Sequence, residues 1–263
     1  MATKCSIPVI DLHDFPNQSS KLIAACEEWG CFRLLNHHEV LPLTLMSEMK
    51  SIVISLFDLP VEIKRQNLKL LPGSGYIAPT EINPIYEALG LYGMDYRREV
   101  ETFCSQLDVS PHQRINKYHF TPESVGSFGV PTHTDSPFLT LLQDDDVVGG
   151  LEVMDKSGHF VPVDPWPGTL IVNIGDMAKV WSNGRFCNVK HRVQCKEATI
   201  RVSIASFLLG PKEPIEPLPE LVDTEHPRAY VPTTHEDYRK LRFSAGLQNG
   251  ETLAVLQTSI FEN

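Results

Sequence analysis

Short apolar runs separated by turn-forming residues dominate the second half of the chain. They cover residues 138–142, 151–154, 169–174 and 200–209, and Gly, Asp, Asn and Pro cluster between them. Runs of this length with such boundaries are typical of strands rather than helices. From about Ile115 onward the pattern predicts antiparallel strands in a sandwich or barrel.

The first hundred residues mix helix and strand. Residues 19–28 are predicted to be helical, with apolar side chains on one side, residues 31–35 to form a strand and residues 42–56 a second helix. Further on, a proline-rich stretch at 211–219 ends the run of strands. Residues 234–242 are expected to form a short helix with a capping residue at its start.

Composition and charge favour a protein with one core and argue against a nucleic-acid-binding or membrane-spanning protein. The 263 residues are long enough for one sizeable core, and no linker or repeat interrupts them. A net charge of −10 argues against a nucleic-acid partner, which would need a basic face. Six cysteines without paired CxxC spacing and no secretory leader fit a cytoplasmic protein, with Cys26 and Cys31 as buried thiols. No apolar run approaches the length of a membrane span.

His133, Asp135 and His191 are the candidate metal ligands. In a strand, side chains two residues apart leave the same face, so His133 and Asp135 could bind one ion, with His191 as the third ligand. Two histidines and one carboxylate are the ligand set of Fe(II) sites that keep open positions for oxygen chemistry. The alternative is a polar loop over 132–137 in which Asp135 merely orients a surface histidine.

Arg201 and Ser203 follow on one face of the next apolar run. The simple interpretation of Arg201 is a salt bridge at the protein surface, which contributes little. However, Arg201 begins an otherwise apolar strand, and a buried guanidinium requires a specific anionic partner. A carboxylate bound in bidentate fashion is such a partner.

These residues belong to a longer set of motifs. From Ile7 to about Pro211 the chain resembles the plant soluble 2-oxoglutarate and Fe(II)-dependent dioxygenases, at residues 7–12, 28–32, 36–37, 59–60, 116–118, 133–135, 173–176, 181–184 and 191–193. Within that family, residues 188–196, 207–211 and 225–228 are most similar to the auxin-oxidising branch. The resemblance implies oxidation of indole-3-acetic acid to 2-oxindole-3-acetic acid, a step of auxin catabolism. The same chemistry on a gibberellin or a flavonoid is the alternative.

The resemblance also implies roles for individual residues. His133, Asp135 and His191 would bind iron, and Arg201 with Ser203 would hold the distal carboxylate of 2-oxoglutarate. Tyr118 would add a hydroxyl to that carboxylate, unless it is simply a core aromatic residue. Asn116 lies where the family often has a polar residue beside the cosubstrate.

The implied cofactors and partners are small. They are Fe(II), 2-oxoglutarate as cosubstrate, ascorbate as a candidate reductant, dioxygen, and an aromatic or indolic acid as substrate, with no nucleic acid and no membrane. The cosubstrate would be oxidatively decarboxylated to succinate and carbon dioxide.

The implied fold is mainly β. A double-stranded β-helix, or jelly-roll, of the cupin type would occupy residues 115–211. A mixed α/β N-terminal region would occupy residues 1–114, and a C-terminal extension with a short helix residues 212–263.

The sequence offers only candidate residues for the lining of the substrate pocket. The main candidates are Tyr76, Phe138 and Phe207, with Ile77 and residues 83–86 as further ones, and the alternative for each is a core residue. A substrate carboxylate would also need a cation or backbone donors. Arg97, Arg98 and Arg185 are available in the sequence, and no pattern chooses among them.

One departure from the family concerns residues 108–115. Relatives have a long helix and a shorter segment between the stretch matching 108–111 and the strand of Asn116, whereas here only residues 112–115 intervene. One helix that covers a face of the barrel is therefore expected to be missing after Gln113. At about 25 cal/mol per Å², a few hundred Å² of exposed apolar surface would cost several kcal/mol, comparable with the stability of a domain. A truncated, inactive variant is thus a further alternative.

Overall fold

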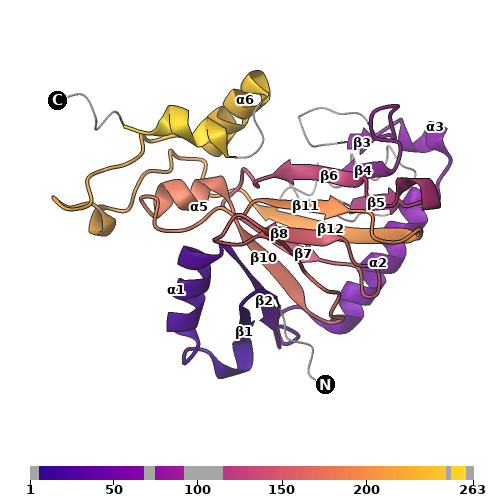
Figure 1. Cartoon of the computed structure of the whole chain (residues 1–263), viewed down its shortest axis with the longest axis horizontal. Helices are drawn as coiled ribbons and strands as arrows, with labels where there is room; N and C mark the ends of the chain where they lie inside the picture. Colours follow the sequence, from indigo (N-terminus) through magenta and orange to yellow (C-terminus); the bar gives the residue numbers. More distant parts are fainter. Residues whose placement is uncertain (1–5, 68–74, 92–114, 247–249, 259–263) are drawn as a thin grey trace.

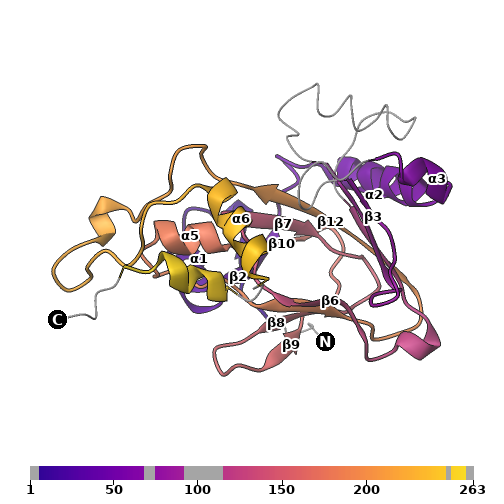
Figure 2. The same cartoon turned by 90° about the horizontal axis from the view of Figure 1, so that it is seen from above.

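Two β-sheets face each other to form a jelly-roll barrel. The structure is a computed structural model that describes residues 6–67, 75–91, 115–246 and 250–258. The large sheet has eight strands in the order β1-β2-β10-β7-β12-β5-β4-β3, and the small sheet four in the order β6-β11-β8-β9. Figure 2 shows the small sheet lying opposite β7, β10 and β12. The strands are β1 Val9–Asp11, β2 Cys31–Leu35, β3 Gly75–Ile77, β4 Tyr86–Gly90, β5 Ile115–His119, β6 Phe128–His133, β7 Leu139–Gln143, β8 Leu151–Met154, β9 Phe160–Pro162, β10 Leu170–Ile174, β11 His191–Gln194 and β12 Ile200–Leu208.

Helices cover the two ends of the large sheet. They are α1 Ser19–Glu28, α2 Leu43–Phe57, α3 Val61–Lys64, α5 Asp176–Trp181 and α6 His235–Ala245, with 3-10 turns at Leu12–Asp14, Pro122–Ser124, Pro219–Leu221 and Glu251–Leu256. Helix α2 packs on the outer face of β12, where Met49 and Val53 meet Val202 and Ile204. Helices α1, α5 and α6 gather at the opposite end (Figure 1). This packing leaves the inner faces of the two sheets to form the barrel wall.

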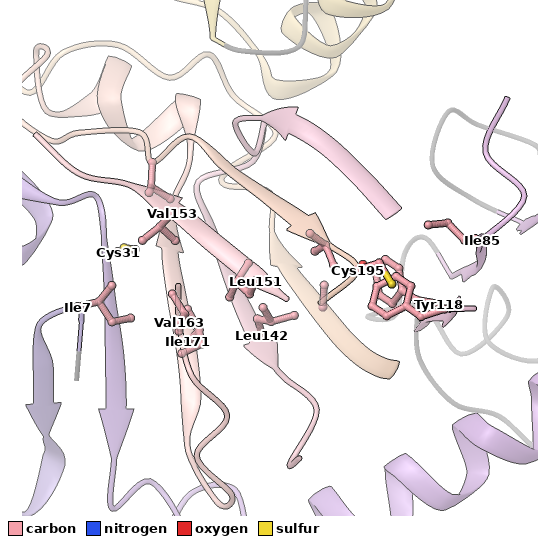
Figure 3. Close-up of a cluster of buried hydrophobic side chains, with 14 residues drawn as sticks. Ile7, Cys31, Ile85, Tyr118, Leu142, Leu151, Val153, Val163, Ile171 and Cys195 are labelled. Carbon is pink, nitrogen blue, oxygen red and sulfur yellow. The ribbon is translucent and has the colours of Figure 1, made fainter. Parts of the chain in front are cut away.

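The main apolar core fills the space between the sheets. Leu142 and Ile171 of the large sheet join Leu151 and Val153 of the small sheet in one buried cluster (Figure 3). Strand β10 is buried along its whole length, because α1 covers its outer face through Val172 and Ile174. Burial on both faces explains why this strand has a continuous apolar run instead of an alternating one.

Most of the elements expected from the sequence are confirmed. The strands at 31–35 and 151–154 and the helix at 19–28 have the expected bounds, and α2 is displaced by one residue. Thr234 caps α6 as expected, since its side chain accepts a hydrogen bond from the backbone N–H of Asp237. Cys26 and Cys31 are both buried and not in disulfides. None of the helices in the described part of the chain could cross a membrane.

The large sheet joins strands from both sides of residue 114. Strands β1 to β4 come from the N-terminal region and pair with β10 and β5 of the predicted jelly-roll core. The two regions therefore share one sheet. The boundaries at 114 and 211 remain predictions, and the expected gap after Gln113 lies outside the described residues.

A buried carboxylate joins α3 to the β3–β4–β5 edge of the large sheet. Glu87 accepts hydrogen bonds from Lys64 at 3.0 Å and from the Tyr76 hydroxyl at 2.7 Å, and lies 2.7 Å from Nε2 of His119. Burial alone would raise the pKa of Glu87, but the hydrogen bonds from these three side chains lower it to about 2. Glu87 therefore stays ionised in the folded protein down to low pH.

We expect Glu87→Gln to destabilise the fold in a pH-dependent way. Because the folded pKa of Glu87 lies below its usual value of 4.5, its contribution is complete above about pH 4.5 and is lost as the pH falls toward 2. The variant should lose about 3 kcal/mol of unfolding free energy at pH 7, and less at pH 3. Urea denaturation at several pH values measures this, with Glu39→Gln on an exposed loop as the control. A pH-independent difference would contradict the assignment.

Candidate metal centre

Three side chains converge at one end of the small sheet. His133 ends β6 and His191 begins β11, and the two residues are paired directly across these strands. Nε2 of each histidine lies 3.7 Å from Oδ1 of Asp135. The ligand atoms all lie within 4.8 Å of one another, which is a spacing at which one metal ion could bind all three.

Asp135 reaches this position in a different way from that expected. Strand β6 ends at His133, so Asp135 lies in the segment after the strand and not on its face. Its carbonyl oxygen accepts a hydrogen bond from the backbone N–H of Asp176. The convergence of His133 and Asp135 therefore depends on the contact with α5 as well as on strand periodicity.

Neighbouring groups orient each ligand atom. Nδ1 of His133 lies 2.9 Å from the carbonyl of Pro131, and Nδ1 of His191 lies 3.2 Å from that of Val189. These contacts place the ring proton on Nδ1 and leave the Nε2 lone pair for a metal. Oδ2 of Asp135 accepts a hydrogen bond from Thr140 at 2.6 Å and a long one from Asn173 at 3.4 Å, so Oδ1 is left to face the histidines.

The charges in this cluster match those of a metal-binding site. Burial and the adjacent His191 lower the pKa of His133 to about 4, so its imidazole is neutral at neutral pH. Burial would raise the pKa of Asp135, but the two histidines lower it, so the carboxylate is ionised. The side chain of His133 is 22% exposed, whereas those of the other two are 8% exposed. The cluster is therefore reached from solvent on the His133 side.

A second polar cluster lies on the inner face of the large sheet. Arg201 and Ser203 of β12 are paired with Tyr118 and Asn116 of β5. The guanidinium of Arg201 lies 4.9 Å from the ring centroid of Tyr118. The Tyr118 hydroxyl interacts with Ser203, and burial raises its pKa. Asn116 accepts a hydrogen bond at 2.9 Å from the Tyr86 hydroxyl on β4.

Arg201 is fully buried and only partly satisfied. One of its nitrogens, Nη2, donates to Asp144, while Nε and Nη1 make no hydrogen bond to any described residue. Burial favours the neutral guanidine, yet the Asp144 carboxylate raises the pKa of Arg201. Buried donors without partners are rare and costly. The arrangement favours an additional anionic ligand beside Arg201.

Comparisons with known proteins agree with this chemistry. Residues 109–210 match the 2OG-Fe(II) oxygenase superfamily, and residues 7–85 match the family described as non-haem dioxygenase in morphine synthesis N-terminal. The 2-oxoglutarate-dependent dioxygenase DAO of Oryza sativa subsp. indica is 45% identical over 297 residues, covering 95% of this chain and 98% of the relative. The chain belongs to the 2-oxoglutarate and iron(II)-dependent oxygenases.

Solved structures and a more distant relative place this oxygenase within the family. The crystal structure of the rice dioxygenase for auxin oxidation has a TM-score of 0.87 at 44% identity, covering 96% of this chain and all of that chain. Dioxygenase for auxin oxidation 1 of Arabidopsis thaliana, in complex with 2-oxoglutarate, has a TM-score of 0.78 at 51% identity, covering 84% of this chain and all of that one. Gibberellin 3-beta-dioxygenase 1 of Arabidopsis thaliana is 29% identical, covering 92% of this chain and 81% of the relative.

The two polar clusters fit the family's iron and 2-oxoglutarate. Two imidazole nitrogens and one carboxylate oxygen supply three ligand atoms and leave the rest of an octahedron open. The unsatisfied donors of Arg201 suit a carboxylate. Both clusters face the inside of the barrel, and apolar side chains of the main core lie around them.

The three predicted pocket residues lie in different places. Phe207 is on the inner face, opposite Thr140 and against the main core cluster, so it lies near Asp135. Phe138 packs its ring against Trp181, with centroids 5.6 Å apart, in the clusters around α5.

For Tyr76 the structure favours the alternative, a core residue, over the pocket. Its ring packs with the α2 cluster and its hydroxyl binds Glu87, which lies on the opposite face of the sheet from Tyr118. Strand β3 has three residues, too few for alternation to indicate which side chain faces inward.

Several polar residues of the site were not predicted from the sequence. They are Thr140, Asn173 and Asp144, which support the predicted residues. Tyr86, which binds Asn116, belongs to the candidate stretch 83–86. Asn173 lies in one of the motifs shared with the family, but no pattern in the sequence indicates its role. Thr140 could have been predicted from the alternation of side chains along its strand. A hydroxyl group on the inward face of an apolar strand requires a buried hydrogen-bond partner.

We expect His191→Ala to abolish iron retention, because only His133 and Asp135 would remain as side-chain ligands. The measurement is metal analysis after anaerobic loading with Fe(II) and desalting. The control is His226→Ala, which removes an exposed histidine beside Asp223. Iron retention equal to that of the wild type would exclude His191 as a ligand.

Arg201→Lys should weaken 2-oxoglutarate binding. Lysine keeps the charge but loses the planar fork, and the loss of about 1.5–3 kcal/mol expected for a charge-assisted hydrogen bond corresponds to roughly a 10- to 100-fold higher dissociation constant. Calorimetric titration with 2-oxoglutarate measures this. Arg192→Lys is the matched control, because Arg192 pairs with Glu152 on the other face of β11 from His191. Unchanged affinity in Arg201→Lys would remove Arg201 from the binding site.

Proposed function

We propose that this oxygenase oxidises indole-3-acetic acid to 2-oxindole-3-acetic acid. His133, Asp135 and His191 would bind Fe(II), while Arg201, Ser203 and Tyr118 would hold the distal carboxylate of 2-oxoglutarate. The observation that carries the substrate assignment is the 45% identity to the rice dioxygenase DAO over 95% of the chain. The geometry of the two polar clusters supports the residue assignments.

The residues of the protein would position the reactants. Fe(II) with bound 2-oxoglutarate supplies an oxidant from dioxygen, releasing succinate and carbon dioxide. Thr140 and Asn173 hold Oδ2 of Asp135, which keeps Oδ1 aimed at the space between the histidines. The Pro131 and Val189 carbonyls fix the two imidazole rings. Reactive groups held in this way need little reorganisation during the reaction.

The barrel interior suits a flat, largely apolar substrate. Phe207 contacts the main core cluster and lies opposite Thr140, so an aromatic ring near the iron would meet an apolar wall. Of the arginines considered for the substrate carboxylate, Arg185 pairs with Glu27 and is exposed. Arg97 and Arg98 lie outside the described residues. We propose residues 115–211 as the catalytic core, with 1–114 completing its large sheet and 212–263 as an extension.

A gibberellin or a flavonoid is the second candidate substrate class, supported by the 29% identity to a gibberellin 3-beta-dioxygenase. An inactive variant is supported by the alignment with the rice relative. Its 297 aligned residues exceed the 263 residues of this chain, so that relative has residues with no counterpart here.

Release of labelled carbon dioxide from 2-oxoglutarate should rise with indole-3-acetic acid. Substrate-stimulated decarboxylation is expected because dioxygen is activated productively only when the substrate is in place. A gibberellin precursor and a flavanone are run in parallel, and 2-oxindole-3-acetic acid is quantified by mass spectrometry. Stimulation by either of these compounds but not by indole-3-acetic acid would overturn the substrate assignment and keep the reaction class.

Thermal unfolding tests whether the chain is an inactive variant. A ligand that binds only the folded state at 100 times its dissociation constant adds about 2.7 kcal/mol. Mn(II) with 2-oxoglutarate should therefore raise the melting temperature by several degrees. No shift at saturating concentrations would favour the inactive variant.

A further inference from the structure

The two segments that carry the predicted metal ligands meet at one buried carboxylate outside the metal centre. Asp176, the first residue of α5, is fully buried. Its Oδ2 accepts a hydrogen bond from Thr134, which stands between His133 and Asp135, at 3.2 Å. Its Oδ1 accepts one from Asn188, three residues before His191, at 2.7 Å. A single side chain therefore connects both ligand-bearing segments.

Helix α6 supplies the charge that this carboxylate requires. Nη1 of Arg242 donates to Oδ2 of Asp176 at 2.6 Å, and the Tyr238 hydroxyl donates to the same oxygen at 2.7 Å. Burial and the nearby Asp176 raise the pKa of Tyr238, which keeps its hydroxyl a donor. A buried carboxylate without such partners would cost several kcal/mol, so Arg242 and Tyr238 of α6 offset the burial of Asp176.

Arg242 also binds the ligand segment itself. Its Nη2 donates to the carbonyl of Thr134 at 2.9 Å, and its Nη1 lies 3.2 Å from the Thr134 hydroxyl. One guanidinium therefore contacts the backbone between His133 and Asp135, and also the carboxylate that accepts a hydrogen bond from Asn188 in the segment before His191. Figure 1 shows α6 lying beside the end of β6, where this segment begins.

The start of α5 holds the same segment from the other side. The backbone N–H of Asp176 donates to the Asp135 carbonyl at 2.8 Å, and that of Gly175 donates to the Phe138 carbonyl at 2.9 Å. A Cβ at Gly175 would lie 2.0 Å from the Pro137 carbonyl oxygen, so only glycine permits this approach. The segment from 133 to 138 is thus enclosed between α5 and α6.

We propose that Arg242 and Tyr238 are positioning residues of the metal centre, which act through Asp176 and Thr134 to set the separation of His133 and Asp135 from His191. The proposal rests on the proposed function in that these three residues are taken as the metal ligands. A simple tether for the C-terminal helix would need to reach only α5. The contacts with Thr134 and Asn188 extend this network to both ligand segments.

Co(II) is the probe for the test, because its visible absorption reports both binding and coordination geometry. The full-length protein is titrated with Co(II) alone, and the melting temperature is measured in parallel. Arg242→Lys keeps the positive charge for Asp176 but cannot also bind Thr134 with a planar fork. Substitution of groups that orient metal ligands typically weakens metal affinity 10- to 100-fold. We expect roughly a tenfold weaker Co(II) affinity and an altered Co(II) spectrum.

Tyr238→Phe removes one hydrogen bond and keeps the ion pair, so it should shift affinity in the same direction by about two- to fivefold. The control is Arg228→Lys, which alters an exposed ion pair with Glu216 away from the ligand segments. If Arg242→Lys does not fold, the Co(II) affinity of Tyr238→Phe alone tests the proposal. Unchanged Co(II) affinity and spectrum in the folded variants, even with a lower melting temperature, would reduce this network to a structural tether and overturn the proposal. Failure of the wild type to bind Co(II) would instead contradict the proposed metal site.

Discussion

The ionised carboxylate of Asp135 is the group on which the site depends. It is buried and ionised, and the imidazole of His133 beside it is neutral at neutral pH, so a carboxylate charge lies inside the protein. Such a charge is costly unless it is paired. Hydrogen bonds from Thr140 and Asn173 satisfy one oxygen, and a divalent cation between Asp135 and the histidines would compensate the other. The arrangement is therefore stable in the form that binds metal.

The second polar cluster carries a buried positive charge, whereas the first carries a buried carboxylate. Arg201 is a buried cation that is held by Asp144 and faces Tyr118, with donors left over for an anion. The two clusters lie on the inner faces of opposite sheets, with an apolar wall around them. A molecule with a metal-binding group at one end and a carboxylate at the other matches this separation of charge, and 2-oxoglutarate has both. Arg201 is fully buried, and the low dielectric of a protein interior strengthens its interaction with an anion.

Strand periodicity explains which parts of this arrangement could be predicted. Arg201 and Ser203 lie two apart on β12, and the structure places both on the inner face. The direct pairing of His133 with His191 joins strands far apart in the sequence, so strand periodicity alone could not predict it. The sequence could not choose between pocket and core for Tyr76, because β3 is too short to show alternation. The Asp176–Arg242 pair spans 66 positions, and no local pattern marks it.

The apparent shortening of the chain affects the barrel and the site differently. Strands β4 and β5 flank residues 91–114 and pair directly, with Tyr86 opposite Tyr118 and Ala88 opposite Asn116. Halving the length of a connection changes its closure entropy by only about 0.6 kcal/mol, so a shorter connection does not weaken this pairing. A lost covering helix would act instead through exposed apolar surface, at about 25 cal/mol per Å². Shortening would therefore lower the stability of the fold before it altered the register that places Tyr118 opposite Arg201.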